Sequence, residues 1–440
     1  MAPRVLLSSV IKPFGPEHGD GFAVTSDANY QVLWAQDAFR PQTTNKQWGI
    51  DFIAANIEAP TTCLHYPTMR QFVRELKRGY DYVGIAFVSP TRHKMKAMVQ
   101  AVRQQAPQTK IVLGGYGTAW GENLSVLADH VCTGEGVAFM RKLLGEDESR
   151  PLVQPDIIQS QRLFSLPMPG KTGFLFAGLG CPNGCDFCAT SQYFKRQHIP
   201  FLKTGDSMVE AIHAMRRRHP DLTNFTITDE DLLLNETRGR QFLKAMRASN
   251  LPPLSITIFS SVKALSQFTA SELVEMGVDL VWVGYEGQRS GYGKQVGRSY
   301  ADLFSDFRAH GISVLASAIL GSDYQTEAIA RQEFEDLLAL EPSLQQFLIY
   351  GPPHGTPLHT RLKAEGRLDE ERMRMPEKID GFSLLFRHKA FEADQIEALQ
   401  KEFYRKAFAR LGPSVFRIVA TWFAGYRNLR DHAQPRIREK

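Results

Sequence analysis

Short apolar runs rich in β-branched residues alternate with polar stretches of helical spacing through the first 150 residues. These runs predict buried strands at residues 5–10, 82–87, 110–115 and 130–136. Between two of them, residues 91–106 have the pattern of a helix. Strands that alternate with helices indicate an α/β fold, here a doubly wound, Rossmann-like parallel sheet with ligand loops at the carboxyl ends of its strands.

A second series of strand and helix units follows a polar, proline-containing stretch. Its strands are predicted at residues 173–178, 224–228, 254–260, 280–284, 312–319 and 345–350. Six such units fit a partial (β/α)6 barrel of the TIM type, in which chemistry is placed at the strand carboxyl ends. The predicted organisation is a Rossmann-like domain at 1–150, a linker at 151–171, the barrel at 172–365 and a helical region at 366–440.

The composition is that of an ordinary globular protein, with 43% hydrophobic and 22% charged residues. No run approaches the roughly 20 apolar residues of a membrane-spanning helix. The first apolar run, at 5–11, has no signal-peptide cleavage motif behind it. Five cysteines, three of them clustered, do not form a disulfide framework. These features predict a cytoplasmic protein.

Positive charge is concentrated at the C-terminus. Residues 405–440 contain nine Lys or Arg and two Asp or Glu, a local charge of +7 within a chain of net charge +5. The nearly neutral body predicts no nucleic-acid partner. Helical spacing aligns an apolar stripe in this tail at Val415, Val419, Trp422, Tyr426 and Leu429, and basic residues continue to Arg436, Arg438 and Lys440. Either the stripe packs on the barrel, or the basic helix lies on an anionic membrane surface.

The densest chemical signal is the spacing Cys181-x3-Cys185-x2-Cys188, which falls after the first predicted barrel strand. Thiolates at this spacing can bind three irons of a [4Fe–4S] cube and leave the fourth iron open. Zinc is the alternative, but a structural zinc site needs four ligands. The nearest other cysteine, Cys132, is far away in sequence, so the fourth zinc ligand would have to be a lone histidine, His198. The spacing therefore favours one iron–sulfur cluster.

With Phe187 in the aromatic position, this motif resembles the CxxxCxΦC signature of the radical S-adenosylmethionine (SAM) superfamily. The resemblance implies that the amino and carboxylate groups of SAM occupy the open iron. It also implies that the reduced cluster splits SAM into methionine and a 5′-deoxyadenosyl radical that abstracts hydrogen. An electron donor such as flavodoxin or ferredoxin would then be needed. An exposed cluster also fits a reducing, cytoplasmic compartment.

The resemblance continues through the predicted barrel. Candidate SAM-binding residues follow successive strands: Asp229, Glu230 and Asp231, then Ser260 and Ser261, then Glu286, then Gly321. Carboxylates suit the ammonium group of SAM, and hydroxyls can reach its ribose or carboxylate. Glu286 resembles a strand-end glutamate that contacts ribose or substrate, and the glycine resembles a motif that packs against adenine. Their order behind the cysteines supports the assignment.

Residues 1–150 resemble the cobalamin-binding domain that precedes the barrel in one large radical SAM subfamily. Residues that would approach the corrin ring or its nucleotide tail follow two predicted strands, at Gly114, Gly115, Gly134, Glu135 and Gly136. The DxHxxG loop that supplies an axial histidine in the wider family is absent, since residues 16–21 hold a histidine at the wrong spacing. Some relatives bind cobalamin without that histidine and others bind none, so cobalamin binding stays open.

These observations predict a radical SAM enzyme that abstracts hydrogen from an unactivated carbon of a small or lipid-like substrate. With cobalamin, the resemblance implies C-methyl transfer. Without cobalamin, it implies dehydration, C–C coupling or rearrangement. A tRNA-modifying enzyme ranks behind because the extra cysteines and a basic body are missing, and a non-catalytic cluster protein would leave the barrel motifs without a role. If the basic tail binds lipid, the protein would lie peripherally at the inner membrane surface.

Overall fold

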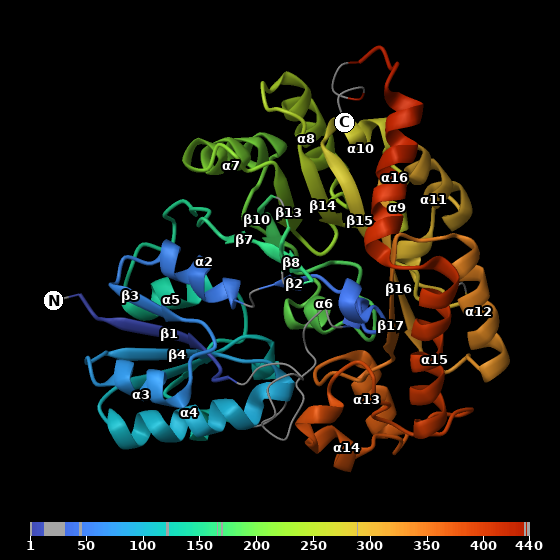
Figure 1. Ribbon diagram of the computed structural model, residues 1–440. Helices are drawn as coiled ribbons and strands as arrows, with labels where there is room; N and C mark the ends of the chain where they lie inside the picture. The colour runs from blue at the N-terminus through green and yellow to red at the C-terminus, as the bar shows by residue number, and fades with distance from the viewer. Residues whose placement is uncertain are drawn as a thin grey trace.

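The computed structural model describes residues 2–12, 31–43, 46–119, 123–164, 166–168, 170–287, 289–434 and 437. It is a mixed α/β structure built on two largely parallel sheets, which confirms the predicted fold class at that level (Figure 1). Within this part of the chain, no helix has the length and apolar character to cross a membrane. Residues 16–21, together with Arg436, Arg438 and Lys440, lie outside the described residues.

The N-terminal sheet has five parallel strands in the order β3-β1-β4-β5-β6. The strands are β1 (Val5–Ser9), β3 (Thr61–Leu64), β4 (Tyr82–Ala86), β5 (Lys110–Gly114) and β6 (His130–Val131). Because side chains alternate along a strand, Leu6 enters one core, while Val5 and Leu7 enter the core on the other face. The chain order reverses beside β1, and such a switch point opens a crevice at the strand carboxyl ends.

Helices cover both faces of this sheet (Figure 1). One pair is α2 (Trp48–Asn56) with α5 (Gly136–Leu144), and the other is α3 (Met69–Leu76) with α4 (Arg92–Gln105). Buried side chains such as Ile50 and Met140 fill the first interface. The doubly wound arrangement places the loops after β4, β5 and β6 at the end of the sheet that faces the rest of the molecule.

The second sheet has six parallel strands in chain order, with one antiparallel strand at its edge. The parallel strands are β10 (Thr172–Phe176), β13 (Asn224–Thr228), β14 (Ser255–Phe259), β15 (Val278–Gly284), β16 (Ser313–Leu320) and β17 (Leu344–Ile349). Strand β7 (Ile158–Gln159) pairs with β10. Outer helices are α7 (Gly205–Arg218), α8 (Glu236–Ala248), α10 (Ala270–Glu275), α11 (Tyr300–Ala309) and α12 (Glu327–Ala339). Six successive β/α units are the topology of the predicted partial barrel.

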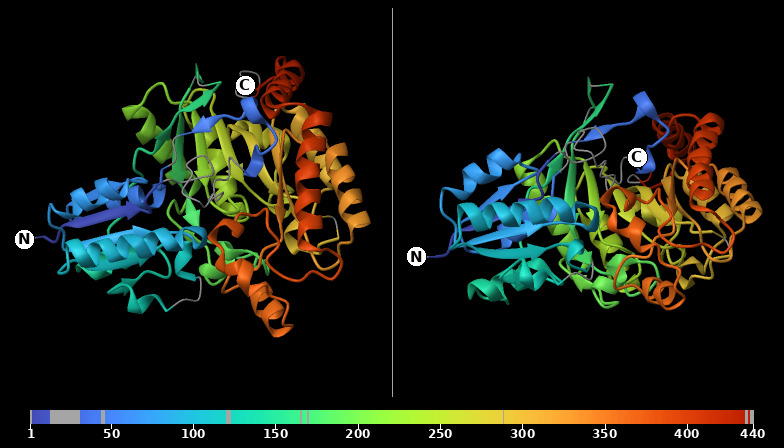
Figure 2. Two further views of the ribbon diagram at one scale, coloured as in Figure 1. Left: turned by 60° about the horizontal axis from the view of Figure 1, so that its bottom comes forward. Right: turned by 90° about the horizontal axis from the view of Figure 1, so that it is seen from below.

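The C-terminal region contains α13 (Pro357–Ala364), α14 (Glu370–Arg374), α15 (Ala393–Leu411) and α16 (Ser414–Leu429). Both views in Figure 2 place these orange and red helices across the molecule from the blue N-terminal layer. Helix α15 packs on β17, where the buried hydroxyl of Tyr404 accepts a hydrogen bond from the Phe347 amide at 2.9 Å. The barrel core therefore extends into this region.

Residues 31–43 pack on the barrel rather than on the N-terminal sheet. The ring of Trp34 lies 5.7 Å from that of Tyr404, and β2 (Gln42–Thr43) pairs with β8 (Gln161–Leu163), which pairs in turn with β9 (Leu166–Pro167). Short strands therefore occupy part of the predicted linker. The domain boundaries inferred from the sequence stay predictions.

Helix α16 packs through small side chains and leaves aromatic ones outside. Its buried residues are Ser414, Thr421, Gly425 and Leu429. A Cβ at Gly425 would overlap Gly311 at the end of α11, so glycine permits this close approach. Large hydrophobic side chains on α16 are exposed at Phe416 (60%), Trp422 (49%), Phe423 (64%) and Tyr426 (55%). Of the five stripe residues, Leu429 is buried, Val415 and Val419 are half-buried, and Trp422 and Tyr426 are exposed, so the stripe packs only in part.

Candidate functional site

The three clustered cysteines lie in a tightly held loop after β10. The loop runs through β11 (Gly178–Leu179), and Cys188 is the N-terminal flanking residue of α6 (Ala189–Tyr193). The hydroxyl of Ser191 donates to the Cys181 carbonyl at 2.6 Å and accepts from the Gly184 amide at 3.1 Å. Gly184 has a positive φ of 68°, a conformation that glycine adopts without strain. The backbone of the loop is thus fixed around Ser191.

The cysteines of this loop would bind a cluster as thiolates, whereas burial favours the protonated thiol when no iron is bound. Cys181 and Cys185 are each 8% exposed and Cys188 is half-buried. Burial raises the pKa of Cys181 to about 12 and that of Cys185 to about 11, and the neighbouring cysteines add to both shifts. Bound irons would displace these protons. In the described part of the chain, no group of three or more His, Cys, Asp or Glu could hold a single metal ion; a cube differs, because each thiolate binds its own iron.

Lys294 lies beside the cysteines and was not singled out from the sequence. It lies in the short 3-10 helix η6 (Gly293–Gln295), forms an ion pair with the buried carboxylate of Glu286, and lies 5.7 Å from the centre of the Phe187 ring. Burial works against its charge, but Glu286 and Cys185 outweigh burial and raise the pKa of Lys294. The loop therefore faces a fixed positive charge, while the second oxygen of Glu286, Oε2, has no partner.

The three consecutive acids after β13 have separate surroundings. Asp229 accepts from Nη2 of Arg238 at 2.6 Å and is 2.9 Å from Nε2 of His198. Burial raises its pKa, but His198 and Arg238 outweigh burial and hold the pKa below its usual value. Glu230 differs, because burial raises its pKa and its Oε2 atom is buried without a partner. Although backbone amides donate to its carboxylate, Glu230 is therefore the acid of the three with one oxygen left unpaired.

The third acid, Asp231, joins two strand ends to the cysteine loop. Its Oδ1 accepts from the Ser260 hydroxyl and from the Ser261 amide, both at 2.9 Å, and its Oδ2 accepts from Asn183 at 2.9 Å. Ser261 also caps the short helix α9 (Val262–Leu265). Both serines are buried and hydrogen-bonded here, so their predicted contact with SAM stays a prediction.

Gly321 lies at the end of β16, with a positive φ of 89°. Its amide donates to Gln325 at 2.7 Å, and a Cβ at this position would lie 3.0 Å from Ile396 of α15. The structure thus explains the glycine by close packing of the C-terminal region. A contact with adenine stays a prediction.

Asp186, inside the cysteine motif, connects the loop to the far side of the barrel. Its Oδ1 accepts from Tyr292 at 2.6 Å and from Tyr350 at 2.9 Å, and Arg361 of α13 lies 3.6 Å from its other oxygen. The Phe187 ring packs edge-on to Tyr292 with centroids 5.2 Å apart. The motif therefore carries a structural carboxylate in addition to the three thiols.

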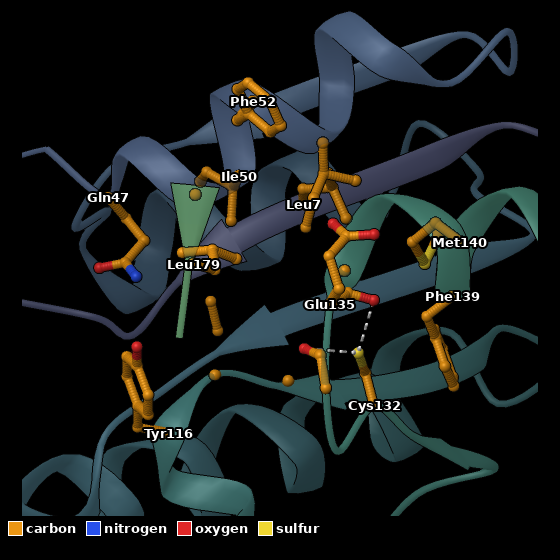
Figure 3. Close-up of a pocket in the computed structure, with 18 of the residues that line it drawn as sticks. Leu7, Gln47, Ile50, Phe52, Tyr116, Cys132, Glu135, Phe139, Met140 and Leu179 are labelled. Atoms are coloured by element: carbon orange, nitrogen blue, oxygen red, sulfur yellow. Dashed lines mark hydrogen bonds between the residues drawn. The ribbon is translucent and has the colours of Figure 1, made fainter. Parts of the chain in front are cut away.

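A first cavity, open to solvent and with about 1090 Å³ of empty space including that opening, lies at the carboxyl ends of β4, β5 and β6 and reaches the cysteine loop. All five residues predicted to approach cobalamin line it: Gly114, Gly115, Gly134, Glu135 and Gly136. Figure 3 shows apolar side chains such as Leu7 and Ile50 over one part of it, with Tyr116 and Cys132 on another. From the barrel side, Leu179 and Tyr193 complete the wall.

The lining of the first cavity suits a large flat ligand. A Cβ at Gly134 or at Gly49, which also lines the cavity, would meet no atom within 4 Å, so the backbone there borders open space. Glu135 instead caps α5, with its carboxylate accepting from Val137 at 2.6 Å and Ala138 at 2.7 Å. Among the described residues that line the cavity there is no histidine. The geometry fits a corrin ring held by backbone and apolar contacts.

Comparisons with known proteins place the fold. No protein-family model matches the chain, and no curated protein matches it. Among solved structures, the fold is similar to that of a radical SAM methyltransferase, in agreement with the resemblance of the motifs to the radical SAM superfamily.

Two of the similar structures are those of TsrM from Kitasatospora setae. The one with cobalamin and a [4Fe–4S] cluster bound has a TM-score of 0.60 and 14% identity, and covers 83% of this chain and 78% of that chain. The other, with tryptophan substrate and the SAM analog aza-SAM, has a TM-score of 0.59 and 13% identity, and covers 82% of this chain and 76% of that chain.

Proposed function

We propose that this protein is a radical SAM enzyme that methylates a carbon of a small-molecule substrate with cobalamin as a cofactor. The observation that carries the proposal is the first cavity, which lies next to the cysteine loop and which Gly134, after β6, borders with open space where a side chain would be. The shared fold with TsrM supports it, because the TsrM structures hold cobalamin, a [4Fe–4S] cluster and a SAM analog.

The chain supplies binding groups for each of these cofactors. The thiolates of Cys181, Cys185 and Cys188 would hold the cluster, and the free oxygen of Glu230 would receive the ammonium group of SAM. The first cavity would hold cobalamin without a histidine ligand. When bound, the reduced cluster supplies the electron that cleaves SAM, and cobalamin supplies a methyl carrier. Hydrogen abstraction from an unactivated carbon, with an electron donor such as flavodoxin or ferredoxin, belongs to the same proposal.

Peripheral membrane contact is a further part of the proposal, supported by the outer face of α16. Trp422, Phe423 and Tyr426 are exposed there, and the exposed Arg427 and Arg430 lie beside them. Aromatic and basic side chains on one face of a helix suit the headgroup region of an anionic bilayer. A cytoplasmic location at the inner membrane surface and a lipid-like substrate would be consistent with this contact.

The deciding experiment is metal analysis after anaerobic expression with excess iron and cobalamin. We expect four irons and one cobalt per chain. Cys185→Ser should lose iron, whereas Cys63→Ser, which changes a cysteine in β3, should keep it. Gly134→Leu should lose cobalt and keep iron, because Gly134 lines the first cavity and a Cβ there meets no protein atom within 4 Å, so the added side chain would take space from the ligand. Full iron without cobalt in the unmodified protein would contradict cobalamin-dependent methyl transfer.

A further inference from the structure

A second cavity, open to solvent and with about 1040 Å³ of empty space including that opening, lies on the other side of the cysteine-loop helix from the first. Its walls come from three parts of the chain. The N-terminal domain contributes Val88, Ser89, Pro90, Tyr116 and Ala119, and Gln31 also lines the cavity. The barrel contributes Ala189, Tyr193, Ile349 and residues 351–354, and the C-terminal region contributes residues within 379–385. No motif singled out in the sequence predicts this meeting of segments.

The two cavities share a wall. Val88, Tyr116 and Tyr193 line both of them. The rings of Tyr116 and Tyr193 are 5.1 Å apart, and the Tyr193 hydroxyl lies 2.9 Å from that of Thr118. Ala189 directly follows Cys188, so the second cavity begins within one residue of the cysteine motif. A molecule in the second cavity would therefore lie next to both proposed cofactor sites.

Asp380 is the one acidic side chain among the described residues that line the second cavity. Its carboxylate accepts from the Phe382 amide at 2.7 Å, which fixes its orientation. Burial raises the pKa of Asp380 to about 6, with Glu397 adding to the shift. The Ser383 side chain also hydrogen-bonds this half-buried carboxylate, and a cationic ligand would add a charged partner that favours its ionised form.

The remaining lining carries no positive charge within the described chain. It contains neither lysine nor arginine. Its one histidine, His354, is stacked on His359 with centroids 4.1 Å apart, and burial lowers the pKa of His354 to about 4, so it is neutral at pH 7. Most other lining side chains are apolar, such as Ile349, Ile379 and Leu385. An anionic ligand would meet neutral donors such as the Ser89 and Ser383 hydroxyls, but no cationic side chain among the described lining residues.

We propose that the second cavity binds the methyl acceptor, and that this acceptor is a compact, largely apolar molecule whose basic nitrogen pairs with Asp380. The identification of the ligand as the methyl acceptor rests on the proposed function. The pairing with Asp380 rests on the cavity alone. A charge-assisted hydrogen bond to the carboxylate would orient the nitrogen toward the C-terminal wall and turn the apolar body toward Tyr116 and Ala189.

The test compares two probes of similar size and opposite charge, phenethylamine and phenylacetate. Binding to the anaerobically purified full-length protein at pH 8 is measured by ligand-observed NMR and calorimetry, with iron and cobalt contents recorded on the same samples. We expect phenethylamine to bind and phenylacetate not to bind. Asp380→Asn should weaken phenethylamine binding about 10- to 100-fold, the effect of losing one hydrogen bond to a charged group.

Two further variants separate recognition from folding. Asp336→Asn makes the same charge change on the outer helix α12 and should leave phenethylamine binding unchanged. Ala119→Phe fills the cavity and should abolish binding. Equal binding of both probes, phenethylamine binding that Asp380→Asn leaves unchanged, or no probe binding in fully metallated protein would overturn the inference. Phenethylamine binding that depends on Asp380, in protein that takes up no cobalt, would support the Asp380 site. The same result would contradict the proposed function, so the two proposals can fail independently.

Discussion

The Oδ2 atom of Asp231 accepts a hydrogen bond from Asn183 at 2.9 Å, which joins the cysteine loop to the end of β13. The same side chain satisfies the buried Ser260 hydroxyl and the Ser261 amide. We expect Asp231→Ala to lower the free energy of unfolding by about 2–4 kcal/mol, because it leaves buried polar groups unpaired. Urea denaturation measures this change, and Asp231→Asn should lower the free energy of unfolding by less than Asp231→Ala does. An unchanged stability in the alanine variant would show that this junction is not needed.

The buried ion pair between Asp229 and Arg238 gives a second prediction. Arg238→Ala should lower the free energy of unfolding by about 3–5 kcal/mol. It leaves the carboxylate of Asp229, which is 4% exposed, with His198 as its remaining side-chain partner. The double variant Asp229→Asn with Arg238→Met removes both charges and should recover much of that loss. Urea denaturation of the set tests this, and equal losses in the single and double variants would contradict it.

Lys294 should affect how firmly the cysteines hold iron. Its charge lowers the pKa of Cys185 against the effect of burial, so removing it makes the thiolate less favourable. We expect Lys294→Met to weaken iron retention about 10-fold, as outer-shell changes do at metal sites, and Lys294→Arg to retain iron better. Iron analysis after exposure to a chelator measures the difference. Equal retention in both variants would assign Lys294 a purely structural role.

Acid should destabilise the protein partly through Asp323. Arg367, followed by Lys389, holds the pKa of Asp323 at about 2, against an ordinary value of 3.8. Since the folded pKa is the lower one, this stabilisation is complete above about pH 4 and is lost as the pH falls toward 2. Asp323→Asn lacks it, so its Tm should decline less steeply across that window. Parallel declines in Tm for the variant and the original protein would contradict this.

The exposed aromatic face of α16 predicts binding to anionic vesicles. The original protein should sediment with vesicles that contain phosphatidylserine and less with pure phosphatidylcholine. Trp422→Ser combined with Phe423→Ser should reduce sedimentation while changing the unfolding free energy by less than about 1 kcal/mol, because both side chains are exposed. Sedimentation that does not depend on these residues would remove the support for membrane contact.

The central strands were predictable because their apolar runs are dense. The run at 224–228 is β13 itself, and the other barrel strands were placed within two residues. Strand β3 at the sheet edge was missed, since its half-buried Thr-Thr-Cys-Leu sequence has no clear periodicity. Residues 31–43 were assigned to the N-terminal domain, because only three-dimensional packing reveals that Trp34 lies against Tyr404.

The candidate site was predictable only where one local motif contains it. The cysteine spacing and the strand-end glycines are local signals, and the structure brings those glycines around one cavity. Lys294 and Asp380 reach their places through the fold, from loops with no distinctive sequence. Three acids in a row likewise could not show that Glu230 is the one with an unpaired oxygen, because Arg238 and Asn183, which pair with the other two, come from other segments.

The hydrogen bonds of Tyr193 to the N-terminal domain bear on how the substrate specificity of such an enzyme could evolve. They attach α6, and with it the cysteine motif, to the wall that both cavities share. The segment around Asp380 lines the second cavity and not the first. With the substrate in the second cavity, as proposed, exchange of that segment alone would alter which molecules are accepted and leave the wall shared with the first cavity in place, so new substrates could arise by grafting rather than by rebuilding.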